Sequence, residues 1–143
     1  MSKYWLVKTE PSVYSFANLE RDGQTVWDGV TNNLAQKHLR SFTRGDRVLV
    51  YHTGDEKRIV GIARVLNDPC PDPKQPGGVL VVVDLRAEQP LPRPVSLSEI
   101  RNSPAFSESP LVRLPRLSVM PITEEQWEAV MQLSGIAHER ATS

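Results

Sequence analysis

Short runs of β-branched and aromatic residues follow one another along this chain without a long helix between them. Strands are expected in these runs, at residues 4–8, 46–52, 59–65, 79–86 and 117–120. Four prolines keep regular structure out of residues 67–78, and a polar turn between the second and third strands predicts a hairpin. Because crossover helices are missing, the pattern predicts an α+β domain in which strands from the beginning, middle and end of the chain share one small curved sheet or barrel.

Short helices are expected between and after these strands. Apolar residues at helical spacing predict a helix at about residues 31–41. Ser96 and Thr123 each begin a capping-box pattern, so each is expected to open a helix, and Gly135 ends the second one. Trp127 lies on the apolar face of that last helix and is therefore expected to be a core residue.

The composition bounds the class of protein. The 143 residues suit one domain at residues 1–135 with a C-terminal tail at residues 136–143. Seventeen basic and seventeen acidic residues give no net charge. This argues against a protein whose whole surface binds long nucleic acid, but it is compatible with a local basic face. Cys70 is the single cysteine, so neither an internal disulfide nor a zinc cluster is expected. A reducing, cytoplasmic location is expected instead.

Several kinds of partner are not expected. The longest aliphatic run is too short to span a bilayer and the first residues lack a signal-peptide pattern, so no membrane partner is predicted. The three histidines have no metal-ligand spacing. No cofactor and no metal are therefore expected.

A polar cluster ends the first predicted strand. Lys8, Thr9 and Glu10 place a cation, a hydroxyl and a carboxylate at one rim of the sheet, where they can bind a ligand. An ordinary solvated strand end would have the same residues.

A second cluster runs from Trp27 to Asn32. Trp27 can act as a stacking wall, Asp28 can read a ligand edge, and Asn32 can cap the following helix, whose free N–H groups favour an acceptor-rich ligand. The alternative makes Trp27 a core residue and Asp28 a turn former.

A histidine and a basic stretch complete the candidates. His52 could act as a general base, but no nucleophile is marked near it, so a hydrogen-bonded pocket or turn residue is favoured. Residues 31–64 hold seven basic groups against three acidic ones. Arg40 and Arg44 in this stretch, together with Arg116, are expected to contact a phosphate backbone, although a merely soluble surface would look similar.

Taken together, these motifs resemble the EVE domain family, which occurs in many small bacterial proteins. The ordered matches are residues 4–11 (YWLVKTEP), 14–15 (YS), 27–30 (WDGV), 45–46 (GD), 51–52 (YH), 60–63 (VGIA), 71–73 (PDP), 111–113 (LVR), 116–119 (RLSV) and Trp127. The resemblance implies a PUA-like fold, which is a mostly antiparallel β pseudo-barrel with short flanking helices. It also relates the chain to YTH modules, which bind one modified base extruded into a pocket.

The match to YTH modules can be followed by residue. Lys8 and Thr9 are similar to the YTH lysine-serine pair, Trp27 to its first cage tryptophan, and residues 61–64 to its Gly-x-Ala-Arg strand. The chain departs from the EVE pattern at several positions. The family usually has serine at Thr9, arginine at Thr31, Ala-Arg-Asn at residues 35–37, where Gln36 and Lys37 stand, and often tyrosine at Cys70. Two arginines near the expected pocket mouth are thereby lost.

The residues and the resemblance together predict a non-enzymatic module that binds DNA or RNA carrying a modified base, flipped into an aromatic and polar pocket. The ligand-binding residues expected are Lys8, Thr9, Glu10, Trp27, Asp28, Asn32 and His52, with Phe106 as an opposite wall. No residue is assigned as catalytic, and a monomer is favoured. Two alternatives stay open: an enzyme acting on a modified nucleobase or nucleotide, with Glu10, Asp28 and His52 as acid–base groups, and a small-molecule module that binds no nucleic acid.

Overall fold

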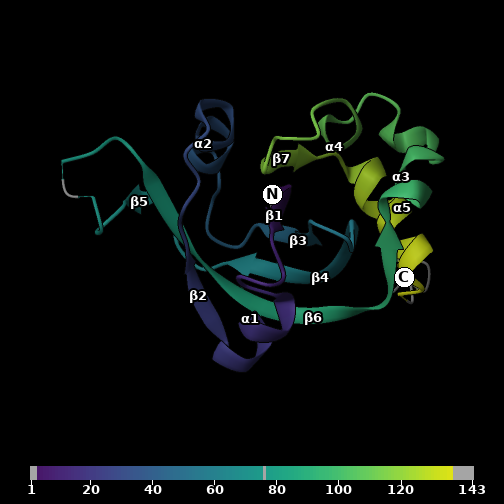
Figure 1. Ribbon diagram of the computed structural model, residues 1–143, viewed down its shortest axis with the longest axis horizontal. Coiled ribbons are helices and arrows are strands. Elements are labelled where there is room, and N and C mark those ends of the chain that lie inside the picture. The colour runs from purple at the N-terminus through teal and green to yellow at the C-terminus, as the bar shows by residue number, and fades with distance from the viewer. Residues whose placement is uncertain (1–2, 76, 137–143) are drawn as a thin grey trace.

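The computed structural model describes residues 3–75 and 77–136, and these form a mixed α/β domain around one seven-stranded sheet (Figure 1). The strand order is β2-β6-β4-β3-β1-β7, and β5 pairs separately with β6. The strands are β1 (Tyr4–Thr9), β2 (Gln24–Trp27), β3 (Arg47–His52), β4 (Arg58–Val65), β5 (Cys70–Pro71), β6 (Val81–Ser96) and β7 (Val119–Ile122). The prediction that strands from the beginning, middle and end of the chain share one sheet is confirmed.

Neighbouring strands in the sheet pair antiparallel except for β1 and β3, which are parallel. The predicted hairpin of β3 and β4 is confirmed. Strands β2 and β7 lie at opposite ends of the strand order, so hydrogen bonds among the described strands do not close a barrel. The mixture of short helices with a mostly antiparallel sheet agrees with the prediction, whereas hydrogen bonds among the described strands do not close the expected pseudo-barrel.

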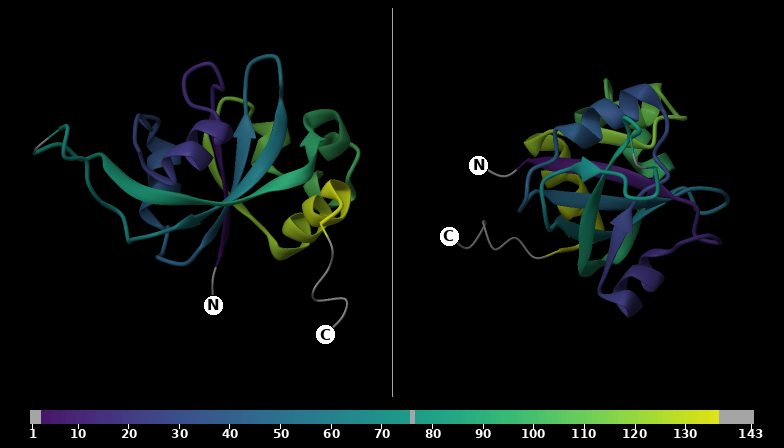
Figure 2. Two further views of the ribbon diagram at one scale, coloured as in Figure 1. Left: turned by 90° about the horizontal axis from the view of Figure 1, so that it is seen from below. Right: turned by 90° about the vertical axis from the view of Figure 1, so that its left-hand side faces the viewer.

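Strand β6 differs most from its prediction. It continues ten residues past the expected end at residue 86 and passes through Pro90, Pro92 and Pro94. Backbone N–H and C=O groups of alternate residues in a strand point to the same side. The three proline nitrogens, which cannot donate, therefore face one edge of β6, and the intervening residues can hydrogen-bond at the other edge. Figure 2 shows β6 as a long ribbon that runs from the β5 loop to the helices at the far end of the sheet.

The helices are short and mostly begin at side-chain caps. They are α1 (Phe16–Asp22), α2 (Asn33–Arg40), α3 (Leu97–Arg101), the 3-10 helix η1 (Pro104–Phe106), α4 (Pro110–Arg113) and α5 (Glu124–Ser134). Ser15, Ser96 and Thr123 each form a complete capping box, and Gly135 ends α5 with a left-handed backbone. Helices α3, α4 and α5 gather at one end of the sheet (Figure 1).

Aromatic packing and one buried carboxylate fix the first strand in the core. Trp127 is buried and stacks on Tyr4 with ring centroids 4.3 Å apart, in keeping with a structural role. The buried carboxylate of Asp46 accepts from the indole N–H of Trp5 at 2.8 Å and from the backbone N–H groups of Lys3 and Thr43. With three donors, this carboxylate is fully compensated for its loss of water.

Two sequence expectations concern the chain's surroundings. No helix among residues 3–75 and 77–136 is long and apolar enough to cross a membrane. The tail predicted at residues 136–143 lies outside the described residues, except for Ile136.

Candidate functional site

A surface pocket of about 460 Å³ opens where β1 and β2 end and the chain approaches β7. We call it the Trp27 pocket. Its lining residues come from four segments and are Lys8, Thr9, Val13, Tyr14, Thr25, Val26, Trp27, Asp28, Gly29, Val30 and Ser118. The fold therefore brings together the polar end of the first strand and the Trp27 cluster, which lie about twenty residues apart in the sequence.

Two aromatic rings form one corner of this pocket. Trp27 is the last residue of β2, pairs with Val83 of β6, and is 7% exposed. Tyr14 meets it edge to face, with ring centroids 6.4 Å apart. The Tyr14 hydroxyl donates to Asp22 at 2.8 Å, and burial together with that carboxylate raises the pKa of the phenol. The sequence argument missed Tyr14 as a site residue, although it belongs to the Tyr14-Ser15 match.

The end of β1 supplies the polar wall. The Thr9 hydroxyl donates to the carbonyl of Tyr14 at 2.6 Å and so ties β1 to the aromatic corner. The Lys8 ammonium donates to the carbonyl of Pro115 at 2.8 Å and lies 5.4 Å from the centre of the Tyr51 ring. Burial lowers the pKa of Lys8 from its ordinary value. Lys8 thus places a partly desolvated cation in the pocket wall.

Asp28 also lines the pocket, and its carboxylate is already paired. Its carboxylate accepts from the ammonium of Lys74 at 2.9 Å, and Lys74 belongs to the loop between β5 and β6. The hydrogen bond that Lys74 donates to Asp28, together with the negative charge of that carboxylate, raises the pKa of Lys74. Gly29 follows with a φ of 77°, a backbone conformation that a glycine adopts without strain. A ligand donor that reaches Asp28 therefore competes with Lys74.

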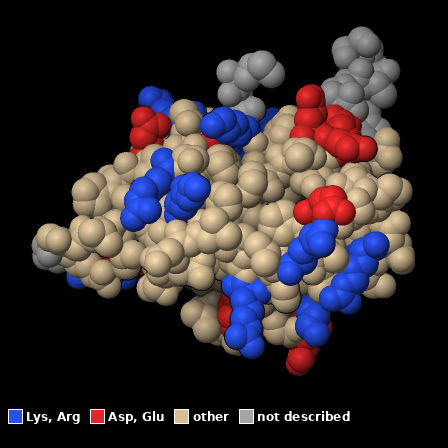
Figure 3. Space-filling model, turned by 90° about the horizontal axis from the view of Figure 1, so that it is seen from above, with Lys and Arg blue, Asp and Glu red and all other residues tan. Residues whose placement is uncertain are grey.

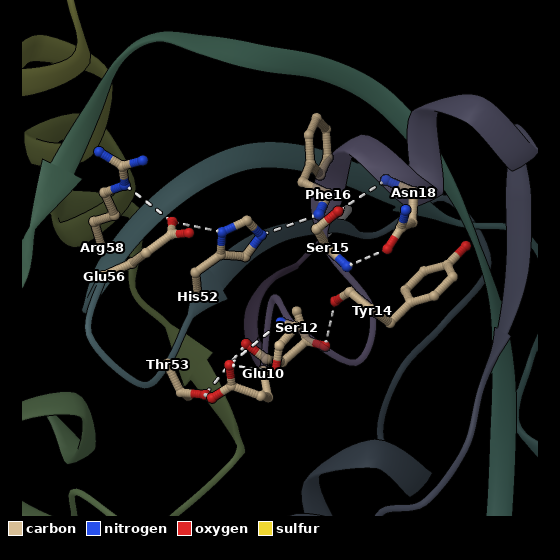
Figure 4. Close-up of polar contacts among 11 residues, drawn as sticks. Glu10, Ser12, Tyr14, Ser15, Phe16, Asn18, His52, Thr53, Glu56 and Arg58 are labelled. Carbon is tan, nitrogen blue, oxygen red and sulfur yellow. Dashed lines mark hydrogen bonds and ion pairs between the residues drawn. The ribbon is translucent and has the colours of Figure 1, made fainter.

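Glu10 and His52 lie outside this pocket, and their side chains hydrogen-bond to neighbouring segments of the chain (Figure 4). Glu10 is exposed and accepts from the backbone and hydroxyl of Ser12 and from the hydroxyl of Thr53. His52 is buried, and its Nε2 atom accepts from the backbone N–H of Phe16 at 3.0 Å. Because these groups hold the loop that carries Tyr14 and the start of α1, they support the Trp27 pocket without lining it.

Asn32 and Phe106 are also placed elsewhere. The Asn32 side chain accepts from the backbone N–H of Ala35 and caps α2, as its position before the helix indicated. Phe106 is fully buried in the core and does not line the Trp27 pocket. The sequence predicted Phe106 as an opposite wall of the pocket. The structure instead turns the ring inward from the short helix η1, so it presents no face to a ligand.

Gln36 has a structural function that its place in the family pattern did not reveal. Its amide donates to the carbonyl of Val30 at 2.7 Å and to that of Val81 at 3.1 Å, and it accepts from the N–H of Val81 at 3.0 Å. The side chain is 2% exposed. Gln36 therefore joins α2 to β6 and fixes Val30, which lines the Trp27 pocket, whereas Thr31 and Lys37 are exposed.

The three arginines expected to contact a phosphate backbone lie on the surface. A guanidinium nitrogen of Arg40 donates to the carbonyl of Val79, and the backbone N–H of Arg44 donates to Asp68. Arg116 lines a second hollow next to the Trp27 pocket. Figure 3 shows basic side chains in separate groups on the face drawn there, with acidic side chains between them. That face carries no continuous basic band.

The fold and the pocket together define a class: an α+β domain with an aromatic and polar pocket at one rim of a mostly antiparallel sheet. The model of the EVE domain matches residues 3–133, and the chain belongs to the EVE domain family. Among residues 3–75 and 77–136, no group of three or more His, Cys, Asp or Glu side chains could hold a metal ion.

Three relatives illustrate the similarity. The chain is 38% identical to Rpa0253 from Rhodopseudomonas palustris, with a TM-score of 0.90 over 96% of this chain and 97% of that one. It is 28% identical to thymocyte nuclear protein 1 of Rattus norvegicus, over 93% of this chain and 74% of the relative. Human THYN1, solved in complex with DNA that contains 5-methylcytosine, is 24% identical, with a TM-score of 0.86 over 96% of this chain and 100% of that one.

Proposed function

We propose that this EVE domain is a non-enzymatic nucleic-acid-binding module that takes a modified nucleobase, flipped out of its strand, into the Trp27 pocket. The observation that carries the proposal is the meeting of an aromatic corner, Trp27 and Tyr14, with a cation and a carboxylate, Lys8 and Asp28, in one pocket. A volume of about 460 Å³ lies within the usual range for small-ligand sites.

The chemistry of a base fits these walls. A flat ring can lie against the aromatic corner, while its edge donates to Asp28 and accepts from Lys8. Extruding a base costs a few kcal/mol of unstacking, and stacking on an aromatic side chain recovers about 1–3 kcal/mol. Hydrogen bonds at the base edge must supply the remainder, so the polar wall carries the selectivity among bases.

The relatives support the same class of ligand. Human THYN1 has been solved with DNA that contains 5-methylcytosine, and the two chains share their fold over nearly their whole length. We extend this binding of a modified base to the present chain. The proposal also takes the curved sheet as a PUA-like pseudo-barrel, the module as a monomer, and its location as the cytoplasm, where the exposed thiol of Cys70 stays reduced.

The test is a binding panel of fluorescent oligonucleotides in DNA and RNA form, each with one 5-methylcytosine, 5-hydroxymethylcytosine or N6-methyladenine, beside unmodified controls. We expect one modified probe to bind at least about tenfold more tightly than its control, which corresponds to about 1.4 kcal/mol. Trp27→Ala should lose about 1–3 kcal/mol of that affinity, and Trp27→Phe should lose less.

Two controls make the result decisive. A 2-aminopurine beside the modified base should brighten on binding if the base leaves the stack, and thermal unfolding should show that Trp27→Ala remains folded. Equal binding of modified and unmodified probes would refute base recognition. Chemical turnover of a modified nucleoside, followed by mass spectrometry, would favour the enzyme alternative, and binding of the free nucleoside without any gain in the oligonucleotide would favour a small-molecule module.

A further inference from the structure

A second hollow of about 420 Å³, which we call the Leu114 groove, lies beside the Trp27 pocket. Three leucines line it: Leu117, which is buried, and Leu34 and Leu114, which are 40% and 46% exposed. Only five large apolar side chains among the described residues are exposed, and two of them lie in this groove. Its walls thus offer an apolar surface that the fold itself does not cover.

A turn builds this groove. The backbone N–H of Leu117 donates to the carbonyl of Leu114 at 2.9 Å, so Pro115 and Arg116 occupy the corners of a β-turn. The turn brings the two leucines to one side and places Arg116 at its tip. Across the groove, the Asn32 cap fixes the start of α2, which carries Leu34. Both walls are therefore held by backbone structure.

The charge of the groove has one sign. Arg113 and Arg116 line it, and none of its lining residues is acidic. Arg116 makes no hydrogen bond or ion pair with any residue that the structure describes. Arg113 pairs with Glu108, but both side chains are more than half exposed, and such pairs exchange partners at little cost. Two available guanidinium groups beside apolar walls match a phosphate linked to a base.

The groove and the Trp27 pocket are lined by adjoining stretches of the chain. Leu117 lines the groove and the next residue, Ser118, lines the pocket. Asn32 lines the groove and Val30, two residues before it, lines the pocket. Lys8, in the pocket wall, donates to the carbonyl of Pro115 in the groove wall.

From these observations we infer that the Leu114 groove is a subsite for the nucleotide next to the flipped base. Its base or sugar packs on Leu34 and Leu114, and its phosphate meets Arg116 and Arg113. The inference rests on the proposed function of the Trp27 pocket. It adds that the protein reads a short single strand rather than one isolated base.

The experiment compares two ligands that carry the same modified base: the free nucleoside, which lacks phosphate and neighbours, and a single-stranded pentanucleotide with that base in the centre. The base is the one preferred in the panel described above. Leu114→Ser and Arg116→Gln alter the groove. Val79→Ser and Arg86→Gln are matched controls, because both residues are exposed and line neither hollow. Thermal unfolding checks the fold of each variant, and NMR titration measures binding.

We expect Leu114→Ser and Arg116→Gln each to weaken pentanucleotide binding about three- to tenfold, to leave nucleoside binding within about twofold, and to differ from both controls. Arg116→Gln should also reduce the slope of affinity against salt concentration by about one contact. Unchanged pentanucleotide binding in the groove variants overturns the inference while the proposed function stands. Equal losses for both ligands also overturn it, because the effect then passes through the Trp27 pocket. A wild-type protein that binds neither ligand overturns both proposals.

Discussion

The imidazole of His52 holds the first turn of α1 in place, because its Nε2 atom accepts the backbone N–H of Phe16 at 3.0 Å. Since Nε2 is the acceptor, the proton lies on Nδ1, which donates to Glu56 at 2.8 Å. The first N–H groups of a helix have no partner within the helix, and here a buried side chain from β3 supplies one. This contact orders the segment that presents Tyr14 to the Trp27 pocket.

Removing that acceptor is expected to destabilise the domain. His52→Ala leaves the N–H of Phe16 buried without a partner, which costs about 1–3 kcal/mol, and it should weaken modified-base binding because Tyr14 loses its support. His52→Gln places an amide oxygen near the former Nε2 position and should recover part of the loss. Urea unfolding and the binding panel measure both effects. If His52→Ala bound its ligand normally at wild-type stability, the contact would have no supporting role.

Phe16 also explains why β4 carries a glycine. A Cβ atom on Gly61 would overlap the Phe16 ring, so Gly61→Ala should destabilise the domain by about 1–3 kcal/mol through overpacking. Phe16→Leu replaces the ring by a smaller side chain, so Gly61→Ala is expected to be less destabilising in the Phe16→Leu background. A double-mutant cycle by chemical unfolding gives the coupling. Additive effects would show that the cost of Gly61→Ala does not arise from overlap with the Phe16 ring.

Glu56 makes stability depend on pH in the acidic range. The hydrogen bond from His52, helped by Arg58, lowers the pKa of Glu56 in the folded state below its ordinary value of 4.5. A lowered carboxyl pKa contributes stability above the unfolded-state value, and this contribution is lost as pH falls through the folded-state value. Melting temperatures between pH 6 and pH 3 should therefore fall less steeply in Glu56→Gln than in the wild type. Parallel curves would exclude this contribution.

Gln36 is expected to be sensitive although it departs from the family's usual residue. Gln36→Ala leaves the carbonyl of Val30 and the N–H and carbonyl of Val81 without their partner. We expect a loss of about 2–4 kcal/mol, from two or more unsatisfied groups. The neighbouring exposed Lys37→Ala serves as control and should stay within about 0.5 kcal/mol of the wild type. Equal melting curves for the two variants would contradict the proposed tie.

The sequence predicted the elements whose signals are local. Strands β1, β3 and β4 and helix α5 have long apolar periodicity or complete caps, and they were found within about two residues of their ends. Strand β2 has four residues and forms only because β6 pairs with it, so no local pattern marks it. The second half of β6 was missed because Pro90, Pro92 and Pro94 argue against a strand, while tertiary pairing with β4 overrides them.

The candidate site also contains residues that local sequence patterns could place and residues that they could not. Lys8, Thr9, Trp27 and Asp28 line the pocket, because each lies at the end of a strand that the sheet brings to one rim. Polar residues were harder to place, since a side chain that can bind a ligand can equally bind the backbone, as Asn32 does when it caps α2. Which partner wins depends on the fold around it. Local sequence patterns therefore indicated residues that line one pocket, together with residues that the fold places outside it.

The ion pair with Lys74 occupies the carboxylate of Asp28, which lines the Trp27 pocket, and its removal is expected to favour binding of a small ligand. Lys74→Gln leaves the Asp28 carboxylate free to accept from a base amino group, so affinity for the free modified nucleoside should rise about two- to fivefold, the range set by exposed ion pairs. Asp28→Asn keeps the shape of the side chain, removes its charge, and should lower that affinity. Lys37→Gln removes an exposed lysine that lines neither hollow and controls for net charge. NMR titration with the nucleoside, which carries no phosphate, separates the release of Asp28 from any loss of phosphate attraction. Nucleoside affinity that is unchanged in Lys74→Gln, or that rises in Asp28→Asn, would remove Asp28 from the base-reading wall.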